Sequence, residues 1–151
     1  MRAVVRRVQR ALVRVKGEVV GEIGEGLLVY LGISSEDDVG ELDWLVPKIA
    51  GLRIFDDDED RMNLSLKDKD LEVLVVSQFT LYGNLRKGFR PSFNRAASPD
   101  HGETLYECFL QRITKELGKS VPTGRFGAHM EVEAVDHGPV TILLDSRDKK
   151  F

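Results

Sequence analysis

The sequence predicts a single α/β domain of three layers, in which mixed β-sheets pack against two main helices. Segments with the composition of strands alternate with segments of helical periodicity, in the order strands, helix, strands, helix, strands. This order is typical of a layered α/β or α+β domain. The chain has 151 residues and no internal repeat, linker or abrupt change of composition, so we assign residues 1–151 to one domain.

The N-terminal segments have the patterns of strands. Residues 3–15 alternate valines with arginines, and residues 17–24 are punctuated by glycines as in a hairpin. Residues 27–33 form a nearly continuous apolar run, which is typical of a strand buried on both faces. These three segments should form neighbouring strands.

The first helix is expected after Ser35, whose side chain can cap it. The apolar residues that follow recur at helical spacing: Val39, Leu42, Val46 and Ile49. Pro47 lacks an amide proton and should kink or shorten the helix. An acidic tip at residues 56–60 comes next, and the apolar run 71–76 then predicts a further strand.

The second helix should begin at Ser98-Pro99-Asp100, which combines an N-cap residue, a proline at the first helical position and an acid in the first turn. Gly118 should end it. One face of this helix is apolar and includes Cys108, which we interpret as a small buried hydrophobe and not as a nucleophile. The chain should close with strands at residues 130–135 and 140–144, joined by a Gly138-Pro139 turn.

The composition excludes several protein classes. Hydrophobic residues at 42% and charged residues at 31% are close to globular averages, so the chain is neither collagenous nor wholly disordered. No apolar run approaches the roughly 20 residues of a membrane span, and the N-terminus lacks the pattern of a signal peptide. With a single cysteine the chain forms no internal disulfide. We therefore expect a cytoplasmic protein that does not associate with membranes.

The charges are segregated along the chain, although the net charge is −3. One basic group is Arg2, Arg6, Arg7, Arg10, Arg14 and Lys16, and a second is Arg86, Lys87, Arg90 and Arg95. Because electrostatic attraction depends on the local field, such clusters can face phosphates despite a negative total. The alternative is that these cations only solvate an edge strand.

Most catalytic motifs are missing. There is no Gly-rich phosphate loop or nucleophile elbow, and His101, His129 and His137 lack metal-ligand spacing, so no metal site is expected. A triad of Ser77, His129 and Asp136 could be drawn, but any sequence of this size supplies such a trio.

Two stretches remain distinctive. Ser77-Gln78-Phe79-Thr80 places polar side chains immediately after an apolar strand, where binding sites are commonly built. Gly138-Pro139-Val140-Thr141 combines a glycine that leaves room for a ligand with a proline that permits a cis bond, which would orient two carbonyls the same way. Taken singly, the first stretch is better explained as a strand terminus and the second as a tight turn.

With their surroundings, these stretches resemble the D-aminoacyl-tRNA deacylases over essentially the whole chain. The matching segments are residues 1–5, Arg7-Val8, Gly24, 26–29, 52–55, 62–65, 77–82, 86–88, 90–93, 123–128 and 138–141. The Ser-Gln-Phe-Thr and Gly-Pro-Val-Thr elements are the diagnostic pair. One departure is Asp136-His137, where the family commonly has Asn-Asp before Gly-Pro.

The resemblance implies a homodimer that hydrolyses the ester joining a D-amino acid, or glycine, to the 3′-terminal adenosine of tRNA. It implies no cofactor and no metal. Gly138 and Pro139 of one subunit would enter the other subunit's pocket and exclude L side chains by main-chain contact. Arg7 would hold this turn in place.

The resemblance also implies roles for further residues. Ser77, Gln78 and Thr80 would lie around the ester, with the amides near Phe79 and Thr80 as oxyanion donors and Thr80 orienting more than attacking. Residues expected to flank the terminal adenine are Phe89, Phe126 and Gly127. Those expected to meet tRNA phosphates are Arg86, Lys87 and Arg90.

Two alternatives stay open. The basic and aromatic residues also suit a non-catalytic protein that binds the tRNA 3′ end and produces no turnover. A hydrolase of small D-amino-acid esters or peptides, using Ser77 or Thr80, would act independently of the tRNA.

Overall fold

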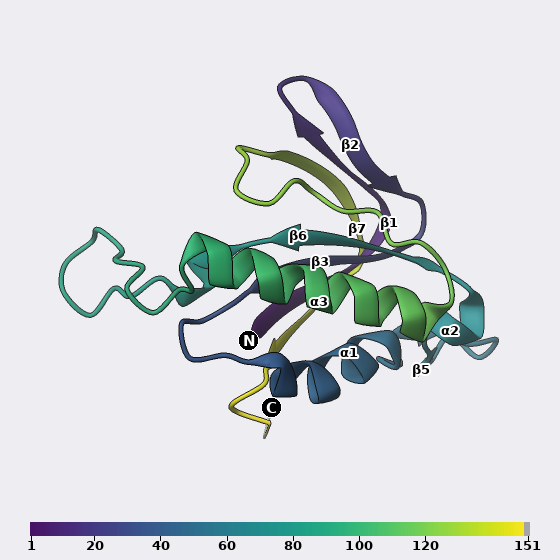
Figure 1. The fold of residues 1–151 in the computed structure, drawn as a ribbon. Coiled ribbons are helices and arrows are strands. Elements are labelled where there is room, and N and C mark those ends of the chain that lie inside the picture. Colours follow the sequence, from purple (N-terminus) through teal and green to yellow (C-terminus); the bar gives the residue numbers. More distant parts are fainter. Residues whose placement is uncertain (150–151) are drawn as a thin grey trace.

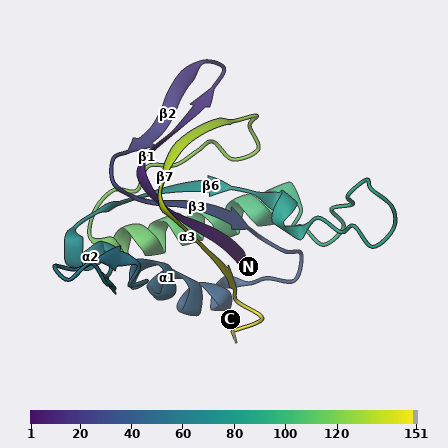
Figure 2. The ribbon, with the colours of Figure 1, turned by 180° about the vertical axis from the view of Figure 1, so that it is seen from behind.

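The computed structural model describes residues 1–149, and its main element is a curled five-stranded sheet (Figures 1 and 2). The long strand β1 (Arg2–Val15) pairs along one side with β7 (Glu131–Asp145). Along its other side it pairs first with β3 (Gly26–Gly32) and then with β2 (Glu18–Ile23). All these pairs are antiparallel, whereas β6 (Glu72–Ser77) is parallel to β3. The sheet is therefore mixed, as the sequence predicts.

Two main helices cover one face of this sheet (Figure 1). They are α1 (Leu42–Ala50) and α3 (Pro99–Leu117), which pack against each other. The short helix α2 (Leu66–Lys69) and a small ribbon of β4 (Phe55–Asp56) and β5 (Met62–Leu64) lie between α1 and β6 in the chain. Two 3-10 helices complete the elements, η1 (Val39–Glu41) and η2 (Phe79–Tyr82).

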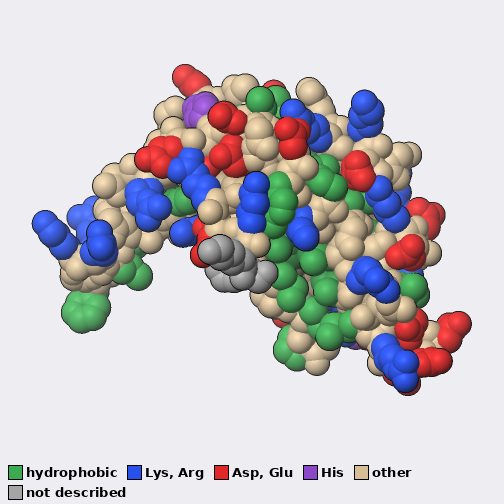
Figure 3. All heavy atoms as spheres, turned by 90° about the horizontal axis from the view of Figure 1, so that it is seen from below, with side chains coloured by type: hydrophobic (Ala, Val, Ile, Leu, Met, Phe, Trp, Pro, Cys, Tyr) green, Lys and Arg blue, Asp and Glu red, His purple; other side chains and the backbone are tan. Residues whose placement is uncertain are grey.

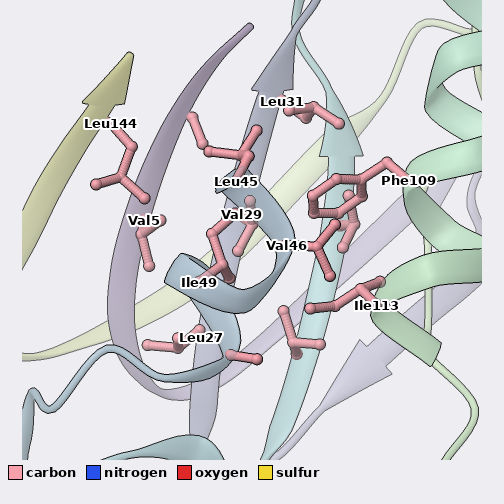
Figure 4. Packing of buried hydrophobic residues seen from close by; sticks show 14 of the residues in the cluster. Val5, Leu27, Val29, Leu31, Leu45, Val46, Ile49, Phe109, Ile113 and Leu144 are labelled. Carbon is pink, nitrogen blue, oxygen red and sulfur yellow. The ribbon is translucent and has the colours of Figure 1, made fainter. Parts of the chain in front are cut away.

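The larger core lies between the helices and the sheet (Figure 4). Every second residue of the strands points into it, since successive side chains of a strand face opposite sides. The strands contribute Val5, Leu27, Val29, Leu31 and Leu144, and the helices contribute Leu45, Val46, Ile49, Phe109 and Ile113.

A second core lies on the opposite face of β3 and β6. The alternate residues of these strands, among them Leu28 and Leu74, meet the distal half of β1 and side chains of β2 and β7. The sheet thus curls so that its distal part covers its own central strands. The result is three layers, one of helices and two of strands, which confirms the predicted fold class.

The helix boundaries are partly as expected. Pro99 and the left-handed Gly118 delimit α3, although the Ser98 side chain makes no capping bond at the N-cap position. The expectation for Ser35 is wrong. Asp38 caps the first helical segment, with a side-chain bond to the Gly40 amide and a reciprocal bond from its own amide to Glu41, so helical structure begins at Val39 in a 3-10 turn.

The Gly138-Pro139 turn is also not as expected. Residues 131–136 and 141–145 pair with the same strand, β1, so no hairpin reverses the chain between them. Thr141 lies opposite Arg6 and Asp136 opposite Val8, and the intervening residues bulge out of the ladder. A 14-residue β1 is long enough to pair with both halves of β7.

None of the helices in the described part of the chain has the length and apolar character to cross a lipid bilayer.

Candidate active site

The first polar stretch emerges where β6 ends. Ser77 is the last residue of β6, and the Gln78 amide still donates to the Leu31 carbonyl oxygen of β3 at 2.8 Å. The chain then turns into the 3-10 helix η2. Because the first amides of a helix have no acceptor within it, the N–H groups of Phe79 and Thr80 are the free donors of this helix start.

A cavity of about 290 Å³ opens beside this helix start. Ser77 and Gln78 contribute polar side chains to its lining, which is otherwise mostly apolar. The full lining is Leu31, Ile33, Ser77, Gln78, Phe79, Ala97, Pro99, Gly102, Phe126 and Gly127. The cavity therefore combines hydrogen-bonding groups at the sheet end with an apolar wall from the start of α3 and the loop that carries Phe126.

The hydroxyl of Thr80 is oriented by its neighbour, since the Gln78 side-chain amide donates a hydrogen bond to it. Within residues 1–149, no histidine or carboxylate is hydrogen-bonded to this hydroxyl. A hydroxyl without an adjacent base is a weak nucleophile. The geometry thus favours an orienting role for Thr80.

Aromatic side chains shape both sides of the cavity. Phe126 lies against Tyr106, with ring centroids 5.6 Å apart, and the buried Tyr106 hydroxyl donates to the Val75 carbonyl oxygen at 2.9 Å. Burial raises the pKa of the Tyr106 phenol, which keeps it a neutral donor. At the rim, the half-exposed Phe79 ring contacts the Phe93 ring edge to face, with ring centroids 4.9 Å apart. These contacts fix the aromatic walls.

The second polar stretch lies elsewhere. Gly138 and Pro139 are exposed at the β7 bulge and do not line the cavity. The peptide bond between them is cis, and Gly138 has φ of +129°, where side chains are rarely tolerated. One chain therefore does not bring this pair to the Ser77–Thr80 cavity.

Arg7 anchors the bulge through a hydrogen bond to the main chain of His137. Arg7 is 6% exposed, and its Nε donates to the His137 carbonyl oxygen at 2.9 Å. Its Nη1 donates to the Ile54 carbonyl oxygen at 2.7 Å and to Asp56 at 3.1 Å. In addition, Asp136 forms a two-bond ion pair with Arg6, at 2.9 and 2.8 Å. Asp136 and His137 are thus both tied to β1, Asp136 by its carboxylate and His137 by its main chain.

The remaining predicted residues lie on a projecting arm, residues 83–97 (Figures 1 and 3). Figure 3 shows basic side chains gathered along it, and the exposed basic residues are Arg86, Lys87, Arg90 and Arg95. Phe89 is fully exposed there and is separate from the cavity that holds Phe126 and Gly127. The aromatic residues expected at the adenine are therefore divided between arm and cavity.

Sequence reasoning missed the contribution of α3. Gly102 is buried in its first turns, and a methyl group there would meet the Phe126 ring at 3.3 Å. A glycine inside a helix is costly and signals a packing reason, which was the available clue. Within the part of the chain that the structure describes, no cluster of three or more His, Cys, Asp or Glu side chains could hold a metal ion.

The comparison with known proteins identifies the family. A family model described as D-Tyr-tRNA(Tyr) deacylase matches residues 4–145. The chain belongs to this family. A D-aminoacyl-tRNA deacylase of Symbiobacterium thermophilum is 57% identical over 151 residues, which cover 100% of this chain and 99% of the relative. One of Thermotoga petrophila is 56% identical over 146 residues, 97% of each chain.

Two solved structures are similar to this chain over almost its whole length. A structure described as c-Myc DNA Unwinding Element Binding Protein is similar with a TM-score of 0.88 and 44% identity, covering 96% of this chain and 98% of the other. A structure of a probable eukaryotic D-amino acid tRNA deacylase has a TM-score of 0.82 and 20% identity, over 95% and 97% of the two chains. The second likeness shows a shared fold.

Proposed function

We propose that the cavity at the end of β6 binds the aminoacylated 3′ end of tRNA and that its main-chain amides promote ester hydrolysis. The reaction is the hydrolysis of D-aminoacyl-tRNA to free D-amino acid and tRNA, the activity named for relatives that match the full chain at up to 57% identity. The observation that carries the proposal is the start of η2, where the amides of Phe79 and Thr80 have no acceptor within the helix and Phe79 lines the cavity. A cytoplasmic location follows from the substrate.

Two main-chain donors suit the demands of this reaction. Water attacks the ester carbonyl, negative charge collects on the carbonyl oxygen, and the bond to the ribose oxygen then breaks as that oxygen takes up a proton. Preformed donors stabilise the charge without reorganising during the reaction. An aminoacyl ester is already activated, and the adjacent ribose hydroxyl can assist the water, so positioning supplies much of the remaining acceleration.

The lining of the cavity suits a terminal nucleoside. An unpaired base binds well against an aromatic ring, and Phe126 supplies one that is held in place by Tyr106. A volume of about 290 Å³ lies at the low end of ligand pockets, so the cavity takes only the end of the strand. Ser77 and Gln78 line the same cavity and would lie next to the ester.

The Gly138-Pro139 bulge would act in a homodimer, in the cavity of the partner subunit. Three features support this: the pair is exposed, it lies outside its own cavity, and Arg7 fixes the main chain beside it. Main-chain groups facing the α-carbon would collide with an L side chain and leave a D side chain free. Such a screen rejects by shape and does not depend on which D-amino acid is attached.

The arm would contact the tRNA outside the cavity. Arg86, Lys87 and Arg90 are exposed and make none of the ion pairs found among residues 1–149. Phosphate contacts by such residues add affinity without regard to sequence. Phe89, also exposed, offers a face on which a base of the strand can stack.

The decisive experiment compares D-tyrosyl-tRNA, L-tyrosyl-tRNA and glycyl-tRNA in the presence of the purified protein. Following the remaining ester should show rapid loss from the D and glycyl substrates and retention of the L ester. If all three esters persist while the tRNA is bound, the protein is a tRNA 3′-end binder and the proposal fails. Equal hydrolysis of D-tyrosyl-tRNA and D-tyrosine methyl ester would instead indicate a hydrolase of small esters.

A further inference from the structure

A second concave site lies at the root of the arm, separate from the cavity. This cleft has a volume of about 410 Å³ and is lined by Arg2, Tyr82, Gly83, Asn84, Leu85, Arg86 and Arg95. Three of these residues are arginines, contributed by β1 and by both ends of the arm. No acidic side chain lines it.

Arg2 is held in place at this cleft. Its Nε donates to Asp145 at 2.8 Å, its Nη1 donates to the Leu81 carbonyl oxygen at 3.0 Å, and its guanidinium lies 4.8 Å above the Tyr82 ring. Tyr82 is almost completely buried, so it forms a rigid floor. Two of the three guanidinium nitrogens are thus used for positioning, which leaves Nη2 for a ligand.

The main chain of the other two arginines, Arg86 and Arg95, is held by hydrogen bonds. Asn84 and Ser92 exchange hydrogen bonds of 2.8 and 3.0 Å across the root of the arm, and the Asn84 side chain accepts from the Arg86 amide at 3.0 Å. The Arg95 carbonyl oxygen accepts from the Ser35 amide at 3.0 Å. Their side chains are exposed and form none of the ion pairs of residues 1–149. The cleft therefore has uncompensated positive charge.

The cleft and the cavity lie at opposite ends of η2. Phe79 begins the helix and lines the cavity, whereas Tyr82 ends it and lines the cleft. At the rise of a 3-10 helix, the two positions are roughly 6 Å apart. This corresponds to about two nucleotide steps of a stacked strand.

We infer that this cleft binds a phosphate group of the tRNA 3′ strand and so sets the position of the aminoacylated end in the cavity. The inference rests on the proposed function for the identity of the RNA. Three guanidinium groups around one concave surface match the geometry of a phosphate, because each offers planar paired donors. Free phosphate has the same chemistry, but the shared η2 helix favours a phosphate that belongs to the bound substrate.

The test removes charge from Arg86 and Arg95, whose side chains form none of the ion pairs of residues 1–149. The variants are Arg86→Gln, Arg95→Gln and the double replacement, and the matched control is Arg61→Gln, an exposed arginine on the acidic tip. Binding of deacylated tRNA is measured by fluorescence anisotropy across a salt series. Each lost phosphate contact should reduce the slope of log affinity against log salt by about 0.7. Equal slopes for the double variant and the control would overturn the inference.

A second measurement separates binding from chemistry. The Arg95→Gln protein and the Arg61→Gln control are given D-tyrosyl-tRNA and a D-tyrosyl ester of adenosine, which has no phosphate. In the Arg95→Gln protein the KM for the tRNA should rise with kcat unchanged, and hydrolysis of the adenosine ester should equal that of wild type. If hydrolysis of the tRNA ester and of the adenosine ester falls by the same factor, the cleft does not act by binding a phosphate.

The two proposals can fail separately. If wild-type protein hydrolyses neither ester but the double variant still loses tRNA affinity and salt slope, the cleft stands and the hydrolytic function fails. Replacing Arg95 with Lys provides a further check, since a charge without the planar fork should preserve the salt slope while weakening affinity. An Arg95→Lys protein with the salt slope of Arg95→Gln would contradict the inference.

Discussion

The guanidinium of Arg7 donates a hydrogen bond to the main-chain carbonyl oxygen of His137, 130 residues away in the chain and 2.9 Å away in space. This bond ties the first strand to the residue that precedes Gly138. The same side chain also reaches the Ile54 carbonyl oxygen and Asp56. One buried cation thus connects the bulge, β1 and the small ribbon.

Replacing Arg7 with Lys should destabilise the protein and slow D-ester hydrolysis. A single ammonium cannot satisfy the acceptors that the forked guanidinium reaches, and an unsatisfied buried carbonyl costs about 1–3 kcal/mol. Urea denaturation gives the free energy of unfolding, and Arg61→Lys serves as the exposed control. A midpoint equal to that of the control would contradict the anchoring role.

Replacing Gly138 with Ala should lower hydrolysis of D-aminoacyl and glycyl esters at least tenfold. The added methyl would lie 2.9 Å from the Val140 side chain and 3.2 Å from Arg7, at φ of +129°. Backbone strain of this kind costs about 1–3 kcal/mol. Gly118→Ala, also at positive φ but with open space around it, is the control for stability alone. Unchanged kinetics in the Gly138 variant would refute the screen.

Replacing Thr80 with Ala should leave most of the single-turnover rate. The hydroxyl is bonded to the Gln78 amide and not to a base, so we expect a loss within about tenfold. Removing a true nucleophile costs on the order of 10⁴-fold or more. Rapid-quench measurements on D-tyrosyl-tRNA distinguish the two, with Thr80→Ser as the comparison. If Thr80→Ala loses the single-turnover activity completely while Thr80→Ser retains it, covalent catalysis by the hydroxyl is established instead.

Replacing Gly102 with Ala should stabilise the helix and impair substrate binding. Alanine is favoured over glycine inside a helix by about 1 kcal/mol, but its methyl would press on Phe126 at 3.3 Å and narrow the cavity. We therefore expect a higher melting temperature with a higher KM. Thr104→Ala, on the exposed side of α3, tests the helix effect without the cavity. A Gly102 variant with wild-type KM would show that this wall does not touch substrate.

Asp145 should make stability sensitive to acid. Burial alone would raise its pKa, but hydrogen bonds from Arg2 and the Arg147 amide, with the charge of Arg2, bring the pKa below the ordinary 3.8. A carboxylate with a lowered folded-state pKa contributes stability above its unfolded pKa and loses it as the pH falls. Unfolding free energies measured from about pH 5 to pH 2 should fall less steeply in Asp145→Asn than in wild type. Identical pH profiles would contradict this contribution.

The sequence predicted much of the framework because strong local signals agree with the tertiary structure. The apolar runs became β3 and β6, and Pro99 and Gly118 delimit α3. Gly-Pro between two apolar stretches has the pattern of a turn, and only the pairing of both halves with one long β1 shows that it is a bulge. Local patterns carry no information about which strand a segment will pair with.

The location of the candidate cavity was partly predictable from the sequence, whereas the roles of its residues stay predictions. Ser77, Gln78 and Phe79 line a cavity at the end of a strand, as polar residues after an apolar run suggested. Ala97 and Gly102 complete it because α3 packs beside β6, and this depends on long-range packing that no local spacing encodes. The separation of Phe89 from Phe126 has the same cause, since the arm departs from the body of the protein.

The two hydrophobic cores share β1, whose proximal residues belong to one and whose distal residues belong to the other. The β7 bulge lies opposite the point of changeover, between Arg6 and Val8. Neither core can unfold unless β1 separates from the strands on both of its sides. Slowly exchanging amide hydrogens in both cores should therefore exchange with the same free energy, that of global unfolding. The Gly138-Pro139 segment would then keep its shape up to the melting of the whole molecule.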